Sequence, residues 1–417
     1  MKRKVLVIGS GGREHAIVYQ LSRSPQVGQI FCAPGNAGIA QLAECVAIED
    51  KDVEQLLCFA IRCQVDLCVV GPEAALAAGV ADAFREAGIP VFGHSKAATQ
   101  IESSKEFAKE LMARYNIPTA AYRSFADYDE AIAYVNSRNT YPTVLKYDGL
   151  AAGKGVVIAQ NEQEAEQALR DMLVGEAFGK GKVVIEDYLE GPEFSFMAFV
   201  DHHRVYPMPL SQDHKRAYDD DKGPNTGGMG AYTPLPFINA EEERWALEHI
   251  LQPVADAMAK EGKPLTGVLY GGLMKTTDGI KVIEFNARFG DPETEVVLPL
   301  LQTDAFTVFH AIAIGTILDN IAWRNEATVG VVMASIGYPG KYAKGAEISG
   351  LEDYNGLALH MGTCKKDGRL VTNGGRVLMC IAHGEDVRSA QANVYKEIEK
   401  IHCSNLFYRK DIAHWAL

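Results

Sequence analysis

Glu284, Asn286 and Arg288, which could bind a metal ion or an anion, lie at alternate positions within residues 282–293, V-I-E-F-N-A-R-F-G-D-P-E. The segment begins with the alternation of a strand, so we expect Val282, Glu284 and Asn286 to share one face. A carboxylate and an amide oxygen suit Mg²⁺, which binds through one or two protein oxygens plus nucleotide phosphates. Arg288 suits a phosphate or carboxylate held beside that metal. Taken alone, the pattern is more often the solvent face of an edge strand, so the rest of the chain must decide.

A first glycine-rich loop, G-S-G-G-R-E-H at residues 9–15, follows an expected strand and opens an expected helix. Backbone N–H groups at a helix N-terminus favour an anion. NAD binding is disfavoured, because Glu14 occupies the third position of G-x-G-x-x-G and no acid follows the second strand. A smaller phosphorylated ligand fits better, with Glu73 near its ribose hydroxyls. The residues expected near its phosphate are Gly11, Gly12 and Arg13. A tight turn without any ligand is the alternative.

A second glycine-rich loop, K-Y-D-G-L-A-A-G-K-G-V at residues 146–156, lies between two expected strands. Such a loop can close over ATP phosphates through its backbone amides. It is not a Walker A sequence, because G-K-[ST] is absent and no helix follows directly. Lys146 and Lys105 are candidates for phosphate contacts, although each lysine alone is better explained as a solvated side chain.

Two further segments are compatible with a nucleotide site. Residues 184–193, V-I-E-D-Y-L-E-G-P-E, form an expected strand that runs into a turn, whose backbone can pair with adenine. Glu193 is placed there to accept hydrogen bonds from ribose hydroxyls. Residues 211–230 are polar and rich in glycine, and both a site-covering loop and a disordered surface loop remain open for them.

The elements that position these residues form three groups. Residues 4–93 alternate strands and helices, which predicts a parallel sheet with helices on both faces and ligands at the carboxyl ends of its strands. A helix, a small α/β unit at about 121–190 and a hairpin follow, and strands with a final helix complete the chain. We predict an α/β fold with boundaries that give domains 1–102, 103–323 and 324–417.

Bulk properties exclude several classes of protein. The 417 residues suggest two to four domains, and 47% hydrophobic with 23% charged residues is a globular composition. No apolar run approaches the roughly 20 residues of a membrane span, and the start is expected to be a strand and not a signal peptide. A net charge of −13 argues against nucleic acid as the main partner. Eight cysteines without C-x-x-C predict reduced thiols in a cytoplasmic protein, with a monomer as the default.

The order of these motifs resembles the ATP-grasp family: a strand ending in Lys146, a glycine loop, the 184–193 hinge, and then Glu284-x-Asn286-x-Arg288. The strings themselves resemble the glycinamide ribonucleotide synthetase (phosphoribosylamine–glycine ligase) family from residue 1 to about 412. Those strings are V-L-V-I-G-S-G-G-R-E-H-A, C-A-P-G-N-A-G, D-G-L-A-A-G-K-G-V, Q-D-H-K-R, G-P-N-T-G-G-M-G and N-A-R-F-G-D-P-E-T.

This resemblance implies a Rossmann-like substrate-binding domain, an ATP-grasp domain with a mobile lid subdomain at about 121–190, and a small α+β C-terminal domain. It implies a ligase that joins glycine to 5-phosphoribosylamine in purine biosynthesis, through glycyl phosphate, with ATP cleaved to ADP and phosphate. The implied magnesium (or manganese) ligands are Glu284 and Asn286. The implied ATP contacts are Lys105, Lys146, Gly149, Gly153, Lys154, Gly155, Glu186, Leu189 and Glu193.

The resemblance also implies positions for the other two substrates. Implied phosphoribosylamine contacts are Gly11, Gly12, Arg13, Glu14, Asn36 and Glu73. Asp213 and Arg288 fall where the amine and the glycine carboxylate would meet, and Lys146 would help to neutralise the transferring phosphoryl group. Tyr147, His94 and the string Cys403-Ser404-Asn405 depart from the commonest pattern, and Tyr147 puts the packing of the lid in doubt.

Three other functions compete with this one. Another ATP-grasp ligase, such as a carboxylase or a formate-using transferase, is opposed by Q-D-H-K-R and R-F-G-D-P-E. A non-catalytic nucleotide sensor is opposed by the presence of Glu284, Asn286 and Lys146. A dehydrogenase is opposed by Glu14.

Overall fold

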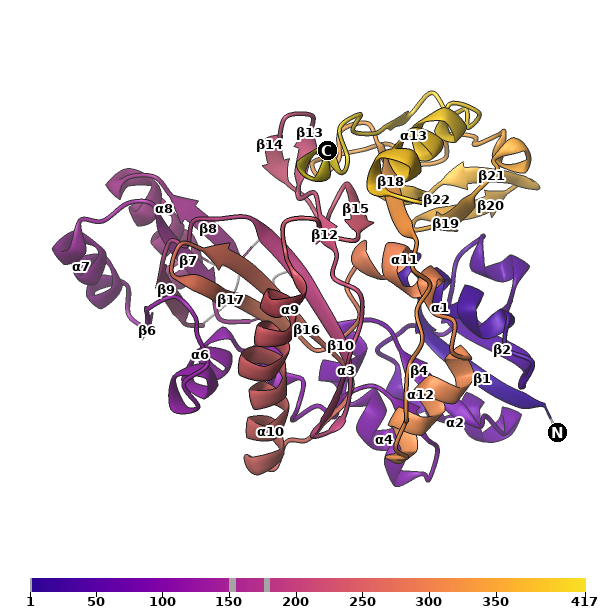
Figure 1. The fold of residues 1–417 in the computed structure, drawn as a ribbon, viewed down its shortest axis with the longest axis horizontal. Coiled ribbons are helices and arrows are strands. Elements are labelled where there is room, and N and C mark those ends of the chain that lie inside the picture. The colour runs from indigo at the N-terminus through magenta and orange to yellow at the C-terminus, as the bar shows by residue number, and fades with distance from the viewer. Residues whose placement is uncertain (1, 150–154, 176–180) are drawn as a thin grey trace.

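The structure, a computed structural model, describes residues 2–149, 155–175 and 181–417. Its elements form an N-terminal α/β unit, a central antiparallel sheet, a lobe that projects to one side, and a C-terminal α+β unit (Figure 1). The mixture of a parallel sheet and antiparallel sheets with helices confirms the predicted α/β fold. Among the described residues, no helix combines the length and apolar character needed to cross a membrane.

The N-terminal unit is built on a parallel sheet of order β3-β2-β1-β4-β5. Its strands are β1 (Arg3–Gly9), β2 (Val27–Pro34), β3 (Glu44–Cys45), β4 (Leu67–Val70) and β5 (Val91–Phe92), and its helices are α1 (Gly12–Ser22), α2 (Val53–Cys63), α3 (Glu73–Ala78) and α4 (Val80–Glu86). Alternate residues of β1 enter different cores: Leu6 packs toward α2–α4, whereas Val7 packs toward α1. Both faces of the sheet are therefore covered, as the continuous apolar strands predict.

The central sheet has the order β11-β10-β16-β17. Its strands are β10 (Glu193–His202), β11 (Arg204–Pro207), β16 (Leu265–Thr276) and β17 (Gly279–Asn286), and the helices around it are α5 (Gln100–Ser103), α6 (Lys105–Arg114), α9 (Ala240–Ala246), α10 (Gln252–Lys260), α11 (Glu293–Val297) and α12 (Ala305–Ile314). Phe92 of β5 stacks among Phe199, Phe289 and Phe309, and its ring centroid lies 4.7 Å from that of Phe309. These aromatic contacts join the N-terminal unit to the central sheet in one continuous core.

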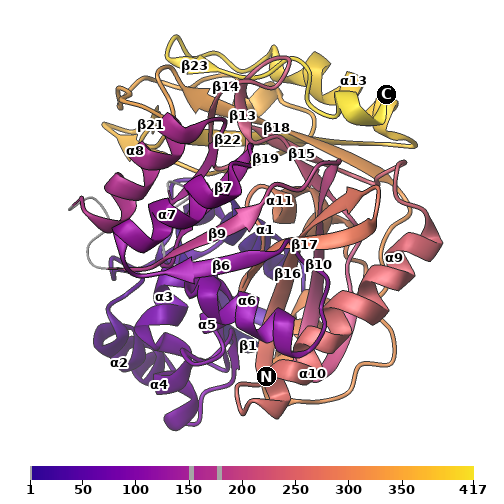
Figure 2. The ribbon, with the colours of Figure 1, turned by 90° about the vertical axis from the view of Figure 1, so that its left-hand side faces the viewer.

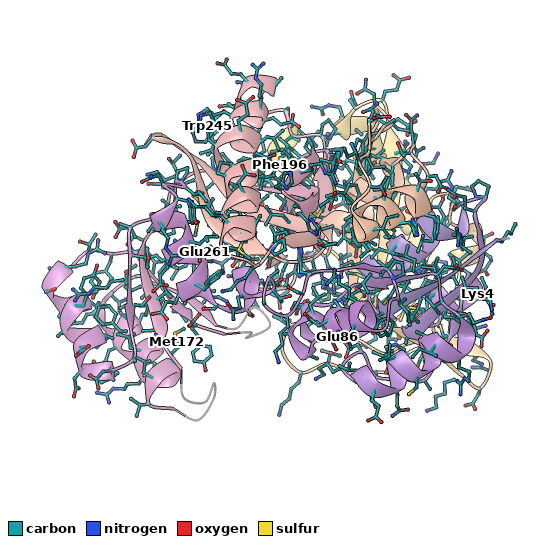
Figure 3. The ribbon with its side chains drawn as sticks, turned by 90° about the horizontal axis from the view of Figure 1, so that it is seen from below. Lys4, Glu86, Met172, Phe196, Trp245 and Glu261 are labelled. Atoms are coloured by element: carbon teal, nitrogen blue, oxygen red, sulfur yellow. The ribbon has the colours of Figure 1, made fainter. Side chains whose placement is uncertain are left out.

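The projecting lobe is an antiparallel sheet of order β6-β9-β7-β8 with two helices. Its elements are β6 (Tyr122–Phe125), α7 (Tyr128–Arg138), β7 (Thr143–Tyr147), β8 (Val156–Ala159), α8 (Glu162–Leu173) and β9 (Val183–Asp187). Leu145, Leu169 and Ile185 belong to a core of its own, separate from the main one. Figure 2 shows this lobe from its outer side, and in Figure 3 it carries Met172 well apart from the N-terminal unit with Lys4 and Glu86.

The C-terminal sheet contains strands from two distant parts of the chain. Its order is β12-β15-β18-β22-β19, with β23 beside β18, so the segment around residues 212–233 pairs with strands that follow residue 326. The strands are β12 (Gln212–Asp213), β15 (Gly230–Thr233), β18 (Ala327–Ser335), β19 (Leu357–His360), β22 (Arg376–Gly384) and β23 (Leu406–Phe407), with hairpins β13 (Arg216–Tyr218)–β14 (Lys222–Asn225) and β20 (Thr363–Lys366)–β21 (Arg369–Thr372), and helix α13 (Val387–Ile398). Because residues 211–230 form ordered strands, a disordered loop is the wrong interpretation of that stretch.

Candidate active site

A β-bulge in β17 decides which side chains face the site. Gly272 pairs with Glu284 and Leu273 pairs with Val282, which leaves Ile283 as an extra residue. Val282 therefore packs in the core with Phe285, and the prediction that Val282 shares a face with Glu284 and Asn286 is wrong. Glu284 is half-buried and, among the described residues, makes no side-chain hydrogen bond or ion pair.

Arg288 links the end of β17 to the N-terminal unit. Its Nη2 donates to Asn286 Oδ1 at 3.0 Å and lies 3.1 Å from Glu102 Oε1, and its Nε lies 3.4 Å from Glu73 Oε2. Burial alone would lower the pKa of Arg288, but these two carboxylates raise it, so the guanidinium stays charged. The pKa of Glu73 is held below its usual value by Arg288 and Arg13, against the effect of burial.

The first glycine loop is closed by its own glutamate. Glu14 Oε2 accepts from the backbone N–H of Gly11 at 2.7 Å, and its Oε1 accepts from Arg13 Nε at 2.6 Å. Arg13 also donates from Nη1 to the carbonyl of Phe289 at 3.2 Å, which ties the loop to the chain just beyond Arg288. Glu14 thus caps helix α1, and its buried carboxylate already occupies part of the anion-binding end of that helix.

The side chain of Asn36 joins three segments. Its Nδ2 donates to the carbonyls of Ser10 at 2.7 Å and His360 at 2.8 Å, and its Oδ1 accepts from the N–H groups of Gly38 and Ile39. Both amide hydrogens and the carbonyl oxygen are therefore engaged within the protein. This geometry gives Asn36 the role of positioning the first glycine loop against the C-terminal unit.

A buried cluster of two lysines and one glutamate joins the lobe to the central sheet. Glu186 of β9 lies 3.0 Å from Lys146 Nζ and 2.7 Å from Lys109 Nζ, and all three side chains are less than 5% exposed. Lys146 also donates to the carbonyl of Ile283 at 2.9 Å, next to Glu284. The sequence singled out Lys146 and Glu186 but missed Lys109, because an ordinary lysine in helix α6 carries no local signal.

The base of the second glycine loop is fixed to the start of α6. Lys105 Nζ donates to the carbonyl of Gly149 at 3.1 Å, and Asp148 accepts from the N–H of Glu106 at 3.2 Å. The carbonyl of Gly155 accepts from the N–H of Tyr147 at the other end of the loop. Two of the predicted ATP contacts, Gly153 and Lys154, lie outside the described residues. Leu189 is half-buried in the turn after β9.

Lys215 bridges two of the predicted site residues. Its Nζ lies 2.8 Å from Glu193 Oε2 and 3.0 Å from Asp213 Oδ1. Burial opposes the charge, but these two carboxylates raise the pKa of Lys215 well above its usual value, and Lys215 in turn lowers the pKa of Glu193. Lys215 belongs to the Q-D-H-K-R string, so the signal for it was present although the residue was not singled out.

Two carboxylates near Asp213, those of Glu293 and Asp291, were not singled out from the sequence. Glu293 Oε1 accepts from Tyr270 Oη at 2.6 Å and from Ser195 Oγ at 3.1 Å, and burial followed by Asp213 raises its pKa. Arg376 of β22 reaches Asp291 Oδ1 at 2.8 Å, so the C-terminal unit supplies a cation here. The sequence around Arg376 predicts only a turn and a strand. Its contact with Asp291 is visible only in the tertiary fold.

These contacts link polar side chains of the lobe, the central sheet and the N-terminal unit. Lys146 of the lobe contacts the strand that carries Glu284 and Asn286. Arg288 joins the end of that strand to Glu73 of the N-terminal unit, and Arg13 of the first glycine loop contacts the carbonyl of Phe289, the residue after Arg288. Hard oxygen ligands beside buried cations suit a nucleotide triphosphate with a divalent metal. The fold and the site thus define an ATP-grasp ligase.

Comparisons with known proteins give the same class and a narrower family. Three sequence models match in order: "Phosphoribosylglycinamide synthetase, N domain" over residues 3–102, its "ATP-grasp (A) domain" over 103–294, and its "C domain" over 328–415. A phosphoribosylamine–glycine ligase of Halalkalibacterium halodurans is 51% identical over 417 residues, covering 99% of this chain and 97% of the relative. One from Pseudomonas aeruginosa is 50% identical over 423 residues, with 99% and 98% covered.

Solved structures agree with these relatives. The phosphoribosylamine–glycine ligase of Thermotoga maritima is 33% identical, with a TM-score of 0.87 and coverage of 98% of this chain and 100% of that one. The biotin carboxylase domain of Hydrogenobacter thermophilus 2-oxoglutarate carboxylase, solved with MgADP and bicarbonate, is 17% identical with a TM-score of 0.75 and shares the fold alone. The chain therefore belongs to the phosphoribosylglycinamide synthetase (phosphoribosylamine–glycine ligase) family. Its activity is the ATP-dependent joining of glycine to phosphoribosylamine in purine biosynthesis.

Proposed function

We propose that this ligase performs its reaction along the carboxyl end of β17, with ATP on the side of the lobe and phosphoribosylamine on the side of the N-terminal sheet. One observation carries this assignment. Lys146 bonds to the carbonyl of Ile283, Glu284 and Asn286 follow, and Arg288 then contacts Glu73 of the N-terminal unit. Phosphate-binding, metal-binding and carboxylate-binding groups thus lie in order along one strand end.

The division of labour follows the units of the fold. We propose residues 1–102 as the phosphoribosylamine-binding domain, 103–323 as the ATP-grasp domain with its lid at about 121–190, and 324–417 as the C-terminal domain. The lid has its own hydrophobic core, which supports movement as one body over bound ATP. Strand β15, which precedes residue 323, pairs with β18, which follows it. This pairing supports the proposal that the C-terminal domain packs against the ATP-grasp domain and completes the site.

Glu284 and Asn286 fit a divalent metal ion. Glu284 is half-buried and its carboxylate makes no hydrogen bond or ion pair in the described part of the chain, and Asn286 Oδ1 faces the same side of β17. One carboxylate and one amide oxygen are hard donors, which favour Mg²⁺ and also admit Mn²⁺. When bound there, the metal would neutralise charge on the β- and γ-phosphates of ATP.

The first step activates glycine. We propose that Arg288 holds the glycine carboxylate, since one N–H of its Nη1 is free of contacts among the described residues. A carboxylate oxygen of glycine attacks the γ-phosphorus of ATP, the bond to ADP breaks, and glycyl phosphate forms. Lys146 and Lys105 neutralise the moving charge beside the second glycine loop.

The second step forms the amide. The neutral amine of phosphoribosylamine attacks the acyl carbon, phosphate leaves with the bonding electrons, and one proton passes from the nitrogen to the departing phosphate. Asp213 is proposed to orient the amine, because its carboxylate lies beside Glu293 and is held by Lys215. The ribose and phosphate are proposed to lie against Glu73 and the first glycine loop, formed by Gly11, Gly12, Arg13 and Glu14. Closure of the lid over the acyl phosphate would exclude water.

The setting of the enzyme is also proposed. We propose a monomer as the default state. All eight cysteines are free thiols, which supports a reducing compartment such as the cytoplasm.

The test measures ADP release with ATP and either Mg²⁺ or Mn²⁺, omitting glycine or freshly generated phosphoribosylamine in turn. We expect release that requires both substrates, a glycinamide product by mass, and loss of release in Glu284→Ala. Rapid release by the folded Glu284→Ala protein would overturn the metal assignment. Release by the wild type with another acid or amine would overturn the substrate assignment while leaving the ATP site in place.

A further inference from the structure

Lys109 is not among the residues assigned to a substrate above, although it contacts one of them. It lies in α6, is 2% exposed, and directs its ammonium group at Glu186 Oε2, 2.7 Å away. It also donates to Thr119 Oγ1 at 2.7 Å, and Thr119 donates to the carbonyl of Val282 at 2.7 Å. Lys109 is therefore fixed on one side to the lobe and on the other to the strand that carries Glu284.

The charges of this cluster do not cancel. Lys109 and Lys146 each lie within ion-pair distance of Glu186, and in the parts of the chain that are described neither lies within that distance of another carboxylate. Lys146 acts at longer range on Glu193, which Lys215 already pairs. Two ammonium groups and one carboxylate leave one positive charge in a buried place. A buried net charge is costly unless a counter-charge arrives, and the phosphates of ATP supply one.

We propose that Lys109 is a positioning residue for ATP, because it shares Glu186 and so leaves Lys146 free to meet the phosphates. Without Lys109, Glu186 would pair with Lys146 alone. The nucleotide phosphates would then approach a Lys146–Glu186 pair that has no net charge. This inference rests on the proposed ATP site at Lys146. It assigns Lys109 an effect on ATP alone, since glycine is placed at Arg288.

The electrostatics of the cluster provide an independent readout. Burial lowers the pKa of Lys109 to about 8, although Glu186 opposes this effect and Lys146 adds to it. The other titratable group facing it is Tyr122 of β6, whose ring centre lies 5.8 Å from Nζ and whose pKa is raised by burial. Between pH 7 and 9, Lys109 should lose its proton while Tyr122 stays neutral.

The experiment compares Lys109→Met with the wild type by steady-state kinetics and by calorimetric titration with MgADP, after thermal melting has established folding. We expect the KM for ATP to rise about tenfold, the effect of roughly one pKa unit of lost charge interaction, with the KM for glycine nearly unchanged. The wild-type KM for ATP should rise between pH 7 and 9, and that rise should be absent from Lys109→Met.

A matched control is Lys182→Met. Lys182 pairs with Glu106 of the same helix α6 at 2.6 Å, but the pair is exposed, so its loss should leave the KM for ATP unchanged. If Lys109→Met fails to fold, Thr119→Val removes the hydroxyl that fixes the ammonium group and keeps every charge. It should raise the KM for ATP by a smaller factor.

The outcomes separate the two proposals. An unchanged KM for ATP in folded Lys109→Met, or in Thr119→Val when the first variant does not fold, would overturn the role of Lys109. An equal rise in Lys182→Met would do the same, because any loss of a contact with α6 would then suffice. If Lys146→Met also leaves ATP binding unchanged, the proposed ATP site itself is wrong.

Discussion

The Arg288 guanidinium donates a hydrogen bond from Nη2 to Oδ1 of Asn286 over 3.0 Å. The residue proposed to hold the glycine carboxylate thus orients a residue proposed to bind the metal. An amide oxygen has two lone pairs, so Asn286 can accept from Arg288 and still coordinate a metal ion. With these two proposed roles, glycine and the nucleotide metal would be coupled through two neighbouring side chains.

Arg288→Lys should show whether glycine binding needs only the positive charge of Arg288 or also the shape of its guanidinium group. Lysine keeps one positive charge but cannot contact Asn286, Glu102 and Glu73 together, so we expect kcat/KM for glycine to fall by about 100-fold or more. Initial rates at varied glycine, with ATP saturating, measure this loss. A normal KM for glycine in the folded variant would mean that the carboxylate is held elsewhere.

Glu284→Ala should abolish turnover with little effect on stability. Because Glu284 is half-buried and its carboxylate makes no hydrogen bond or ion pair among the described residues, we expect the free energy of unfolding to change by less than about 0.5 kcal/mol. Urea unfolding and ADP release are measured on the same preparation. A large loss of stability would show that the carboxylate serves the fold, and Glu284→Gln serves as the control of equal size.

Asn36→Ala should lower the stability of the protein, and any effect on substrate binding should follow from that change. Four hydrogen bonds of the side chain connect residues 10, 38, 39 and 360, so we expect a loss of about 1–3 kcal/mol in the free energy of unfolding. The KM for phosphoribosylamine should rise as a consequence of the displaced loop. Unchanged urea unfolding together with a raised KM would instead identify Asn36 as a direct substrate contact.

Acid should destabilise the protein before its carboxylates titrate. Burial is the largest cause that lowers the pKa of His15 to about 3 and the pKa values of His94 and His360 to about 4, below the unfolded value of about 6.5. Each folded pKa is depressed, so the unfolded chain binds more protons as the pH falls. Stability is therefore complete above pH 6.5 and is lost progressively toward pH 4.

Urea unfolding midpoints at several pH values between 7.5 and 5 measure this loss. His94 provides the control, because its Nδ1 accepts from the N–H of Thr266 at 2.9 Å and its Nε2 bonds to the carbonyl of Val268 at 2.8 Å. His94→Gln should lower stability at pH 7.5 and weaken the pH dependence. An identical pH dependence in wild type and variant would exclude His94 as one of the responsible groups.

Local sequence determined the elements and the motifs. Strand alternation, glycine turns and capping residues act over a few neighbours, which is why the parallel βα pattern and the glycine turn between β1 and α1 could be predicted. Sequence strings likewise led to the family, because they encode the loops of the site. The same reasoning failed at Val282, since a bulge depends on how β16 pairs with β17 and leaves no signature in the alternation of one strand.

Tertiary structure alone decided which side chains meet. Asn36 and His360 are 324 positions apart, and Lys109 of α6 meets Glu186 of β9 only because the folded chain brings the lobe to that helix. Such contacts arise from the burial of the shared core and from the satisfaction of buried polar groups, which depend on the whole packing and not on spacing. The sequence therefore determined the chemical groups of this ligase, whereas the packed fold determined their partners, and with them which groups are free to meet the substrates.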